Sequence, residues 1–333
     1  GSRLDAARGG CSMRIRTGLG VLAAGAVLVG GSIVPAAAQD DGTRIAVVVH
    51  GEPSSRFWAV VKAGAEQAAK DLGVTVDYYA PTAFDMVQVA QLIDTAVATE
   101  PDGLAVAVAD PDALGPSIKA AVAAGIPVIT MNSGLDAYKE LGALTHVGSD
   151  ETVAGAAAGQ RLADSGVKNA LCLNDEVGNI ATDTRCEKAT EAIVAAGGKM
   201  EVLPVPLGDP IGIQAAVAAR LQADPTIDAT LSQGPDTAVP ALAAVKEAGM
   251  VDKVHSATFD LGVDTLNALI AGEMDFAVDQ QQYLQGYLPV SFLTLLDRYQ
   301  LMPGGGLPVL SGPNFVTADN AADVLELSEA GIR

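Results

Sequence analysis

The chain has 333 residues, enough for one large domain or two ordinary ones, and its hydrophobic content of 49% is ample for a buried core. Asp and Glu together number 40 and Lys and Arg 20, which gives a formal net charge of −20. This charge argues against nucleic acid and against an anionic membrane surface as partners.

The first 38 residues predict export. Residues 13–16 are short and basic, residues 19–34 are apolar with interspersed glycines, and three alanines end at Ala38. This order is typical of a secretory signal peptide cleaved after Ala38, and the apolar run is short for a membrane anchor. We therefore interpret residues 1–38 as an upstream extension and signal peptide. The mature chain is expected in the periplasm or at the extracellular face of the membrane.

The cysteines predict one disulfide. Cys11 precedes the cleavage point, so the mature chain keeps Cys172 and Cys186, an even pair in an exported protein. We expect them to join a strand to the next helix. No CxxC motif is present and the three histidines are far apart in sequence, so neither a metal site nor a cofactor is expected.

From Arg44 onward, short apolar runs alternate with amphipathic helical patterns. The predicted strands are 45–49, 74–79, 104–109, 127–131, 145–148, 170–174, 201–205, 229–232, 254–259 and 276–278. Such alternation predicts parallel sheets covered by helices on both faces. Ten strands are many for one ordinary sheet, so we expect two α/β lobes with a break near 146–150. The late glycine- and proline-rich segment predicts a surface connection and a return strand before a last helix, 321–330.

Ligands of parallel α/β sheets bind beyond the carboxyl ends of the strands, so residues at strand exits are the candidates. His50, Ser55, Phe57 and Trp58 follow the first strand, and Trp58 is the only tryptophan in the chain. An aromatic face can stack on the C–H face of a sugar ring. The alternative is that Phe57 and Trp58 anchor the following helix to the sheet.

Further polar side chains follow the fourth and sixth strands. Asn132 and Ser133 come first; the amide can bridge adjacent hydroxyls or close an Asx-turn. Arg185 lies on the helix after the sixth strand, where a guanidinium could donate to hydroxyl oxygens. From spacing alone, a surface ion pair with Asp183 or Glu187 is the favoured role for Arg185.

Three more residues complete the candidates that follow predicted strands. Asn179 either contacts a ligand or serves a turn. Asp260 follows the ninth strand and either caps the next helix or accepts hydrogen bonds from hydroxyls. Gln280 opens a run of three amides after the tenth strand; at least one should face a polar cavity unless the loop is solvated.

Motifs of enzymes are absent from the sequence. There is no GxSxG elbow, no HExxH pair and no P-loop, and the glycines at 304–306 lack dinucleotide-binding spacing. We therefore do not expect an enzyme.

Taken together, the segments IAVVVHGEPSSRFWAVVKAGAEQAAKDLG, IPVITMNSG, ATFDLG and AVDQQQYLQGY resemble the type I periplasmic binding proteins. These are the sugar receptors of ABC importers; the chain is similar to the ribose-binding group and, within it, to polyol receptors. The resemblance implies two similar Rossmann-like lobes joined by a three-segment hinge. It places residues 44–149 plus 281–310 in the N-terminal lobe and 150–280 plus 311–333 in the C-terminal lobe.

The resemblance also implies roles for single residues. Arg185 falls on the family's ligand-contacting arginine, and Asp260 and Gln280 match family positions. Asn132 and Ser133 stand where the family has an Asp-Arg pair. Gly234 stands where it has an asparagine, which removes one amide contact. These departures change the hydroxyl pattern that is recognised, so a monosaccharide, polyol or cyclitol other than ribose is expected.

The sequence thus predicts a monomeric, exported receptor that closes over a small polyhydroxylated ligand and delivers it to the permease of an ABC transporter. One alternative is a sensor that reports the ligand to a membrane signalling protein. Another is a secreted sugar-modifying enzyme.

Overall fold

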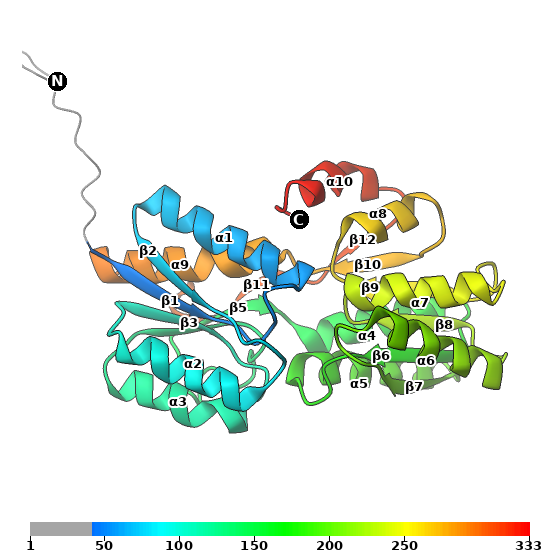
Figure 1. The fold of residues 1–333 in the computed structure, drawn as a ribbon, viewed down its shortest axis with the longest axis horizontal. Helices are drawn as coiled ribbons and strands as arrows, with labels where there is room; N and C mark the ends of the chain where they lie inside the picture. Colours follow the sequence, from blue (N-terminus) through cyan, green and yellow to red (C-terminus); the bar gives the residue numbers. More distant parts are fainter. Residues whose placement is uncertain (1–41) are drawn as a thin grey trace, which may run out of the picture. The chain divides into compact units, whose positions relative to one another are not determined.

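The computed structural model describes residues 42–333, so the predicted extension and signal peptide at 1–38 lie outside the described residues. In the described part, the strands form two six-stranded sheets (Figure 1). The first sheet has the order β11-β5-β4-β3-β1-β2 and the second the order β12-β10-β9-β8-β6-β7. All pairs are parallel except β10 with β12, which is antiparallel.

The strands of the first sheet are β1 (Arg44–Val48), β2 (Thr75–Tyr79), β3 (Gly103–Ala107), β4 (Val128–Asn132), β5 (His146–Ser149) and β11 (Val309–Gly312). Those of the second are β6 (Asn169–Asn174), β7 (Lys199–Pro204), β8 (Ala229–Ser232), β9 (His255–Phe259), β10 (Phe276–Asp279) and β12 (Asn314–Val316). Ten strands and one return strand in the late segment were expected; twelve are described, because the late segment supplies two short strands, one for each sheet.

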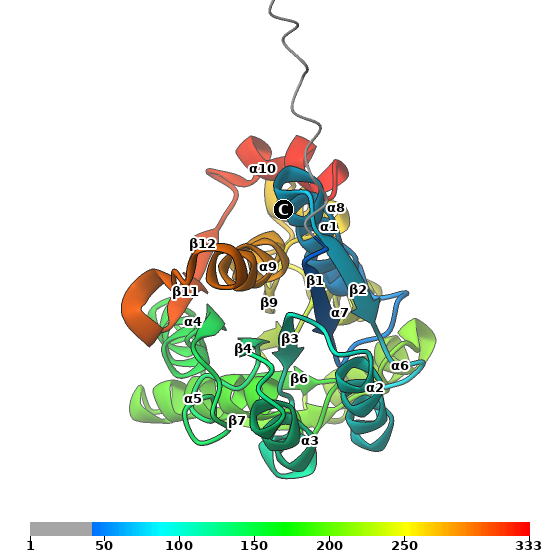
Figure 2. The ribbon, with the colours of Figure 1, turned by 90° about the vertical axis from the view of Figure 1, so that its left-hand side faces the viewer.

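Helices cover both faces of the first sheet (Figure 2). Helices α1 (Arg56–Leu72) and α9 (Gln282–Tyr299) lie on one face, and α2 (Met86–Ala98) and α3 (Pro111–Ala123) on the other. Because both faces are covered, β3 is buried along its whole length and its sequence is a continuous apolar run. Helices α1 and α9 approach closely at Gly286, where a Cβ would lie 1.9 Å from the carbonyl oxygen of Val61.

The second sheet is covered in the same way. Helices α4 (Glu151–Asp164) and α5 (Ile180–Ala195) pack on one face, and α6 (Pro210–Ala223) and α7 (Pro235–Glu247) pack on the other. Helices α8 (Val263–Ile270) and α10 (Ala321–Glu329) complete a further cluster beside β10 and β12. Aspartate side chains accept from backbone N–H groups at the starts of α2, α3, α4 and α6, which explains where these helices begin.

The chain passes between the two sheets three times. The crossings lie between β5 and α4, between β10 and α9, and at Pro313 between β11 and β12. We call the part built on the first sheet, with α1–α3 and α9, the first lobe, and the remainder the second lobe. The predicted fold of two lobes, each with a sheet flanked by helices, is confirmed, and the sheets are parallel apart from the antiparallel edge strand β12.

Candidate functional site

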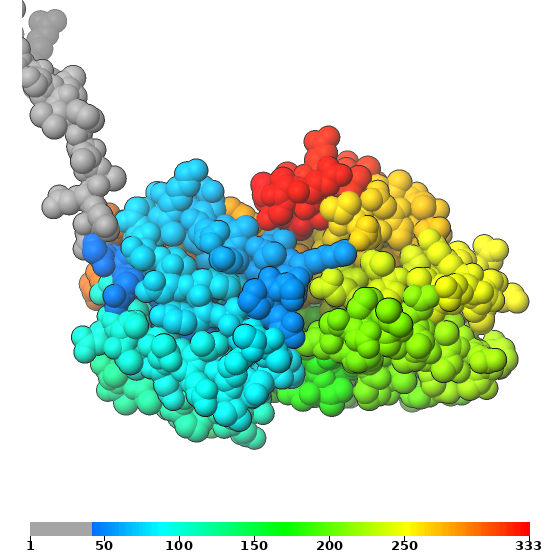
Figure 3. All heavy atoms as spheres, viewed as in Figure 1, coloured from blue at the N-terminus to red at the C-terminus, as the bar shows by residue number. Residues whose placement is uncertain are grey.

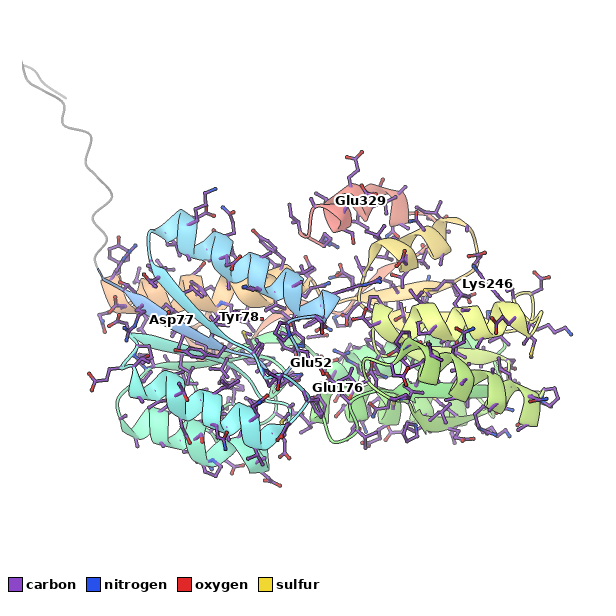
Figure 4. The ribbon with its side chains drawn as sticks, viewed as in Figure 1. Glu52, Asp77, Tyr78, Glu176, Lys246 and Glu329 are labelled. Carbon is purple, nitrogen blue, oxygen red and sulfur yellow. A yellow bond between two sulfur atoms is a disulfide. The ribbon has the colours of Figure 1, made fainter. Side chains whose placement is uncertain are left out.

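A cavity of about 370 Å³ is lined by residues of both lobes. Nine of the ten predicted ligand-binding residues line it, all except Ser133: His50, Ser55, Phe57, Trp58, Asn132, Asn179, Arg185, Asp260 and Gln280. In Figure 4, Glu52 of the first lobe and Glu176 of the second lie where the two lobes meet, and both line the same cavity. The carboxyl ends of two parallel sheets therefore converge on one site, as the strand-exit argument requires.

Aromatic rings form the first-lobe wall. The ring of Trp58 meets those of His50 and Phe57 edge-on, with centroids 4.8 Å and 5.0 Å apart. Trp58 is only 5% exposed and also packs in the core of the first lobe, so anchoring and cavity lining are both observed for it. Gly51 permits this placement, because a Cβ there would overlap the indole ring. Phe84, which the sequence analysis missed, packs edge-on against His50.

A buried polar cluster joins the lobes at His50. The Nε2 atom of His50 lies 3.6 Å from a carboxylate oxygen of Glu176 and 3.3 Å from Nδ2 of Asn179. Asn179 donates to Glu176 at 2.6 Å and also caps α5, so the turn role expected for it is observed as well. Burial alone would raise the pKa of Glu176, but contacts with His50 and Asn179 lower it below its usual value. Glu176 is therefore held ionised at the cavity wall.

Arg185 is held by a partner that its spacing did not reveal. It makes a bidentate ion pair with Glu151 at the start of α4, Nε–Oε2 2.5 Å and Nη2–Oε1 2.9 Å, and both residues are buried. The expected surface pairing with Asp183 or Glu187 is wrong: Asp183 accepts from Asn174 and a backbone amide instead. Burial opposes the charge of Arg185, but Glu151 outweighs burial and raises its pKa.

Asp260 presents a buried carboxylate to the cavity. Its backbone is left-handed, with φ of 63°, and its Oδ1 accepts from Nε2 of Gln280 at 2.7 Å. The capping alternative is wrong, because α8 begins after Gly262 and takes no bond from Asp260. Burial raises the pKa of Asp260 to about 7, against the lowering effects of the Arg185 charge and the Gln280 hydrogen bond.

The amides of the cavity floor are held by α9. Nδ2 of Asn132 donates to Oε1 of Gln285 at 3.1 Å, and Gln285 in turn donates to Oε1 of Gln280 at 2.9 Å and to Oγ of Ser311 at 3.1 Å. Gln285 is fully buried, so it fixes Asn132 and Gln280 without lining the cavity itself. Ser133 lies behind this wall, where its hydroxyl donates to the oxygens of Asn132 and Asn179.

Comparison with known proteins identifies the fold's family. Residues 45–296 match the family model described as a periplasmic binding protein domain. This chain belongs to that family. A carbohydrate transporter protein from Acidothermus cellulolyticus, solved in complex with myo-inositol, is 38% identical with a TM-score of 0.83, and the match covers 88% of this chain and 100% of that one.

Two further relatives are more distant. A xylitol-binding protein of Mycolicibacterium smegmatis is 28% identical over 78% of this chain and 75% of its own length. A xylose/arabinose-binding protein of Sulfolobus acidocaldarius is 24% identical over 82% of this chain and 71% of its own length. The prediction of a solute-binding protein rather than an enzyme is confirmed by the family, and the family's periplasmic setting agrees with the expected location.

Several residues around the cavity of this periplasmic binding protein were missed by the sequence analysis: Glu151, Glu176, Gln233 and Gln285. Glu176 and Gln233 line the cavity but follow strands at positions where a solvated loop or helix start is the ordinary expectation. Glu151 and Gln285 act through their neighbours and lie on helices. The sequence signal for two of them is position: Gln233 comes directly after β8, and Glu176 is the second residue after β6.

Two ion pairs join the lobes beside the cavity, and Arg56 and Asp236 also line it. Arg56 at the start of α1 contacts Asp236 of α7, Nε–Oδ1 3.2 Å, and Asp264 of α8, Nη1–Oδ2 2.8 Å. Figure 3 shows a blue segment of the first lobe against yellow segments of the second. Arg56 belongs to the first lobe and both aspartates to the second. The contact therefore exists only while the lobes are together.

Arg56→Gln is expected to weaken ligand binding by about two- to tenfold, because half-exposed ion pairs contribute little individually. The loss should shrink as salt is raised, since salt screens the wild-type pairs. Calorimetric titration at low and high salt measures both. Lys119→Gln, which breaks an exposed pair with Glu140 away from the cavity, is the control. Equal affinities of wild type and Arg56→Gln at low salt would contradict the prediction.

Proposed function

We propose that this protein is the receptor of an ABC importer for a monosaccharide, polyol or cyclitol. The observation that carries the proposal is the cavity between the lobes, in which aromatic rings and fixed polar groups face one another. The 38% identical relative is a carbohydrate transporter protein bound to myo-inositol, and another relative binds xylitol. These favour a cyclitol or polyol as the first candidate.

The chemistry of the wall suits a neutral, many-hydroxyl molecule. The ring of Trp58 offers an apolar face for carbon atoms, and Asp260 and Glu176 are strong acceptors for hydroxyl protons. The Nε and Nη2 atoms of Arg185 donate hydrogen bonds to Glu151, so its third nitrogen, Nη1, is the donor for a ligand oxygen. When the lobes close over the ligand, each polar side chain of the cavity exchanges a hydrogen bond to water for one to a ligand hydroxyl. A ligand that lacks one hydroxyl therefore leaves a buried protein group without a hydrogen-bond partner.

Delivery follows from the two-lobe design. A ligand that touches both lobes binds the closed form better than the open form and shifts the population toward it. The three crossings act as the hinge, about which the lobe built on the first sheet moves against the lobe built on the second. The closed form presents both lobes to a membrane permease, and the signal peptide directs the chain across the membrane beforehand.

A thermal-unfolding screen tests the ligand class. We expect myo-inositol, xylitol, xylose or D-arabinose to raise the unfolding midpoint, because a ligand that binds only the folded state stabilises it in proportion to the logarithm of its concentration. Glucuronate is the control, since ionised carboxylates line the cavity and repel it. If no neutral sugar, polyol or cyclitol raises the midpoint, the proposed ligand class is wrong.

A further inference from the structure

Gln233 lies directly after β8 and lines the cavity, yet the mechanism above gives it no role. Its side chain is 4% exposed, and its Oε1 atom is buried with no hydrogen-bond partner in the described part of the chain. A buried acceptor without a partner costs free energy, so its retention calls for a reason.

The orientation of this amide is set by the disulfide. Cys172 of β6 and Cys186 of α5 are bonded to each other, as the cysteine count predicts. The Nε2 atom of Gln233 lies 3.2 Å from both sulfur atoms. A disulfide sulfur carries no hydrogen and can only accept, so the NH₂ group faces the sulfurs and the oxygen faces away from them.

We propose that Oε1 of Gln233 is a ligand-contacting acceptor, held in that orientation by the Cys172–Cys186 disulfide. A ligand hydroxyl in the cavity supplies the missing donor. The neighbouring Gly234 has no side chain, and a Cβ there would lie 3.9 Å from the Asp260 carboxylate, so Gln233 lies beside a polar group that also lines the cavity.

The disulfide has a second consequence for recognition. Reduced cysteines carry S–H groups that can donate as well as accept. In the dithiol state the amide of Gln233 is free to turn by half a rotation and present its NH₂ group to the ligand instead. The disulfide between Cys172 and Cys186 therefore determines that Gln233 presents its oxygen, an acceptor, and not its NH₂ group to the ligand.

This inference rests on the proposed function, and the first measurement separates the two. Wild-type affinity for myo-inositol and xylitol is determined by calorimetric titration. Absence of binding to both and to the other screened compounds overturns the function and the inference together. Where wild type binds, Gln233→Leu is expected to bind about 5- to 100-fold more weakly with an unchanged apo unfolding midpoint. Wild-type affinity in Gln233→Leu overturns the inference alone.

Gln282→Leu is the matched control. Gln282 is 1% exposed and neither polar atom of its amide has a hydrogen-bond partner among residues 42–333, but it does not line the cavity. We expect this variant to bind like wild type. An equal loss of affinity in Gln233→Leu and Gln282→Leu would mean that removal of any buried amide weakens binding. That result would overturn the proposed contact between Gln233 and the ligand.

A mutant cycle tests the role of the disulfide. Cys172→Ala with Cys186→Ala is expected to weaken binding severalfold in the wild-type background and not further in the Gln233→Leu background. Folding of each variant is checked by circular dichroism. A full second loss in the Gln233→Leu background overturns the link to the disulfide. If the cysteine variant does not fold, ligand analogues that each lack one hydroxyl test the contact instead. We expect one analogue to bind wild type weakly and to bind Gln233→Leu with the same low affinity. If no analogue behaves in this way, the proposed contact is wrong.

Discussion

Replacement of Arg185 by alanine is expected to destabilise the ligand-free protein by about 3–5 kcal/mol. Removing the guanidinium leaves the Glu151 carboxylate buried without its bidentate partner, and also exposes one face of the Phe259 ring, over which the guanidinium lies at 4.5 Å. Urea unfolding followed by circular dichroism measures the change. The loss is larger than that of a surface contact because neither charge reaches bulk water.

Two control variants separate charge from packing. Arg185→Met combined with Glu151→Gln removes both charges and keeps the volume, so it is expected to recover most of the stability lost by alanine. Lys188→Ala on the same helix breaks exposed pairs with Glu187 and Glu191 and should leave stability nearly unchanged. An Arg185→Ala protein that unfolds at the wild-type urea concentration would show that the pair contributes nothing.

Asp260→Ala is expected to weaken polyol binding by roughly 100-fold or more, since a buried carboxylate forms strong hydrogen bonds to hydroxyls. Gln280 would also lose the partner that orients it. The ligand-free variant should be at least as stable as wild type near pH 8, where the buried charge of Asp260 is unfavourable. Calorimetric titration and thermal unfolding measure the two effects. Wild-type affinity in Asp260→Ala would show that Asp260 does not contact the ligand.

The pH dependence of binding and stability carries a definite sign. The folded pKa of Asp260, about 7, lies above the ordinary value of 3.8, so the folded state holds more protons than the unfolded state between these values. Its stabilising contribution is full below pH 3.8, falls as pH rises through 7, and then stays constant. Ligand hydroxyls prefer the ionised carboxylate, so affinity should rise from pH 5 to pH 8 with release of a proton.

Asp260→Asn is the variant that isolates this titration. It is expected to flatten most of the pH dependence of affinity, measured by calorimetry in buffers of different ionisation heat. Asp175 is still titratable in this variant, because burial and the charge of Glu176 raise its pKa to about 6. The free energy of unfolding should therefore still fall with rising pH, but less steeply than in wild type. An unchanged pH profile in Asp260→Asn would assign the titration to another group.

The residues selected from strand exits line one cavity because of the topology of the sheets. In parallel α/β sheets, residues at the ends of the strands are carried to one edge of each sheet. His50 and Asn132 from the first sheet and Asp260 from the second therefore line the same cavity although they are far apart in sequence. Ser133 shows the limit of that reasoning. Successive side chains at a strand end point in different directions, and that of Ser133 supports Asn132 and Asn179 from behind the wall.

Sequence alone determined the alternation of strands and helices, the two-lobe fold and the edge of each sheet at which the cavity lies, because hydrophobic period and turn residues are local properties. Tertiary structure decided the partners: Glu151 for Arg185, Gln285 for Asn132, and the disulfide for Gln233. These contacts join residues 34 to 153 positions apart. No local pattern encodes them, because they depend on how packed helices and two sheets bring distant side chains within 3 Å or so of one another.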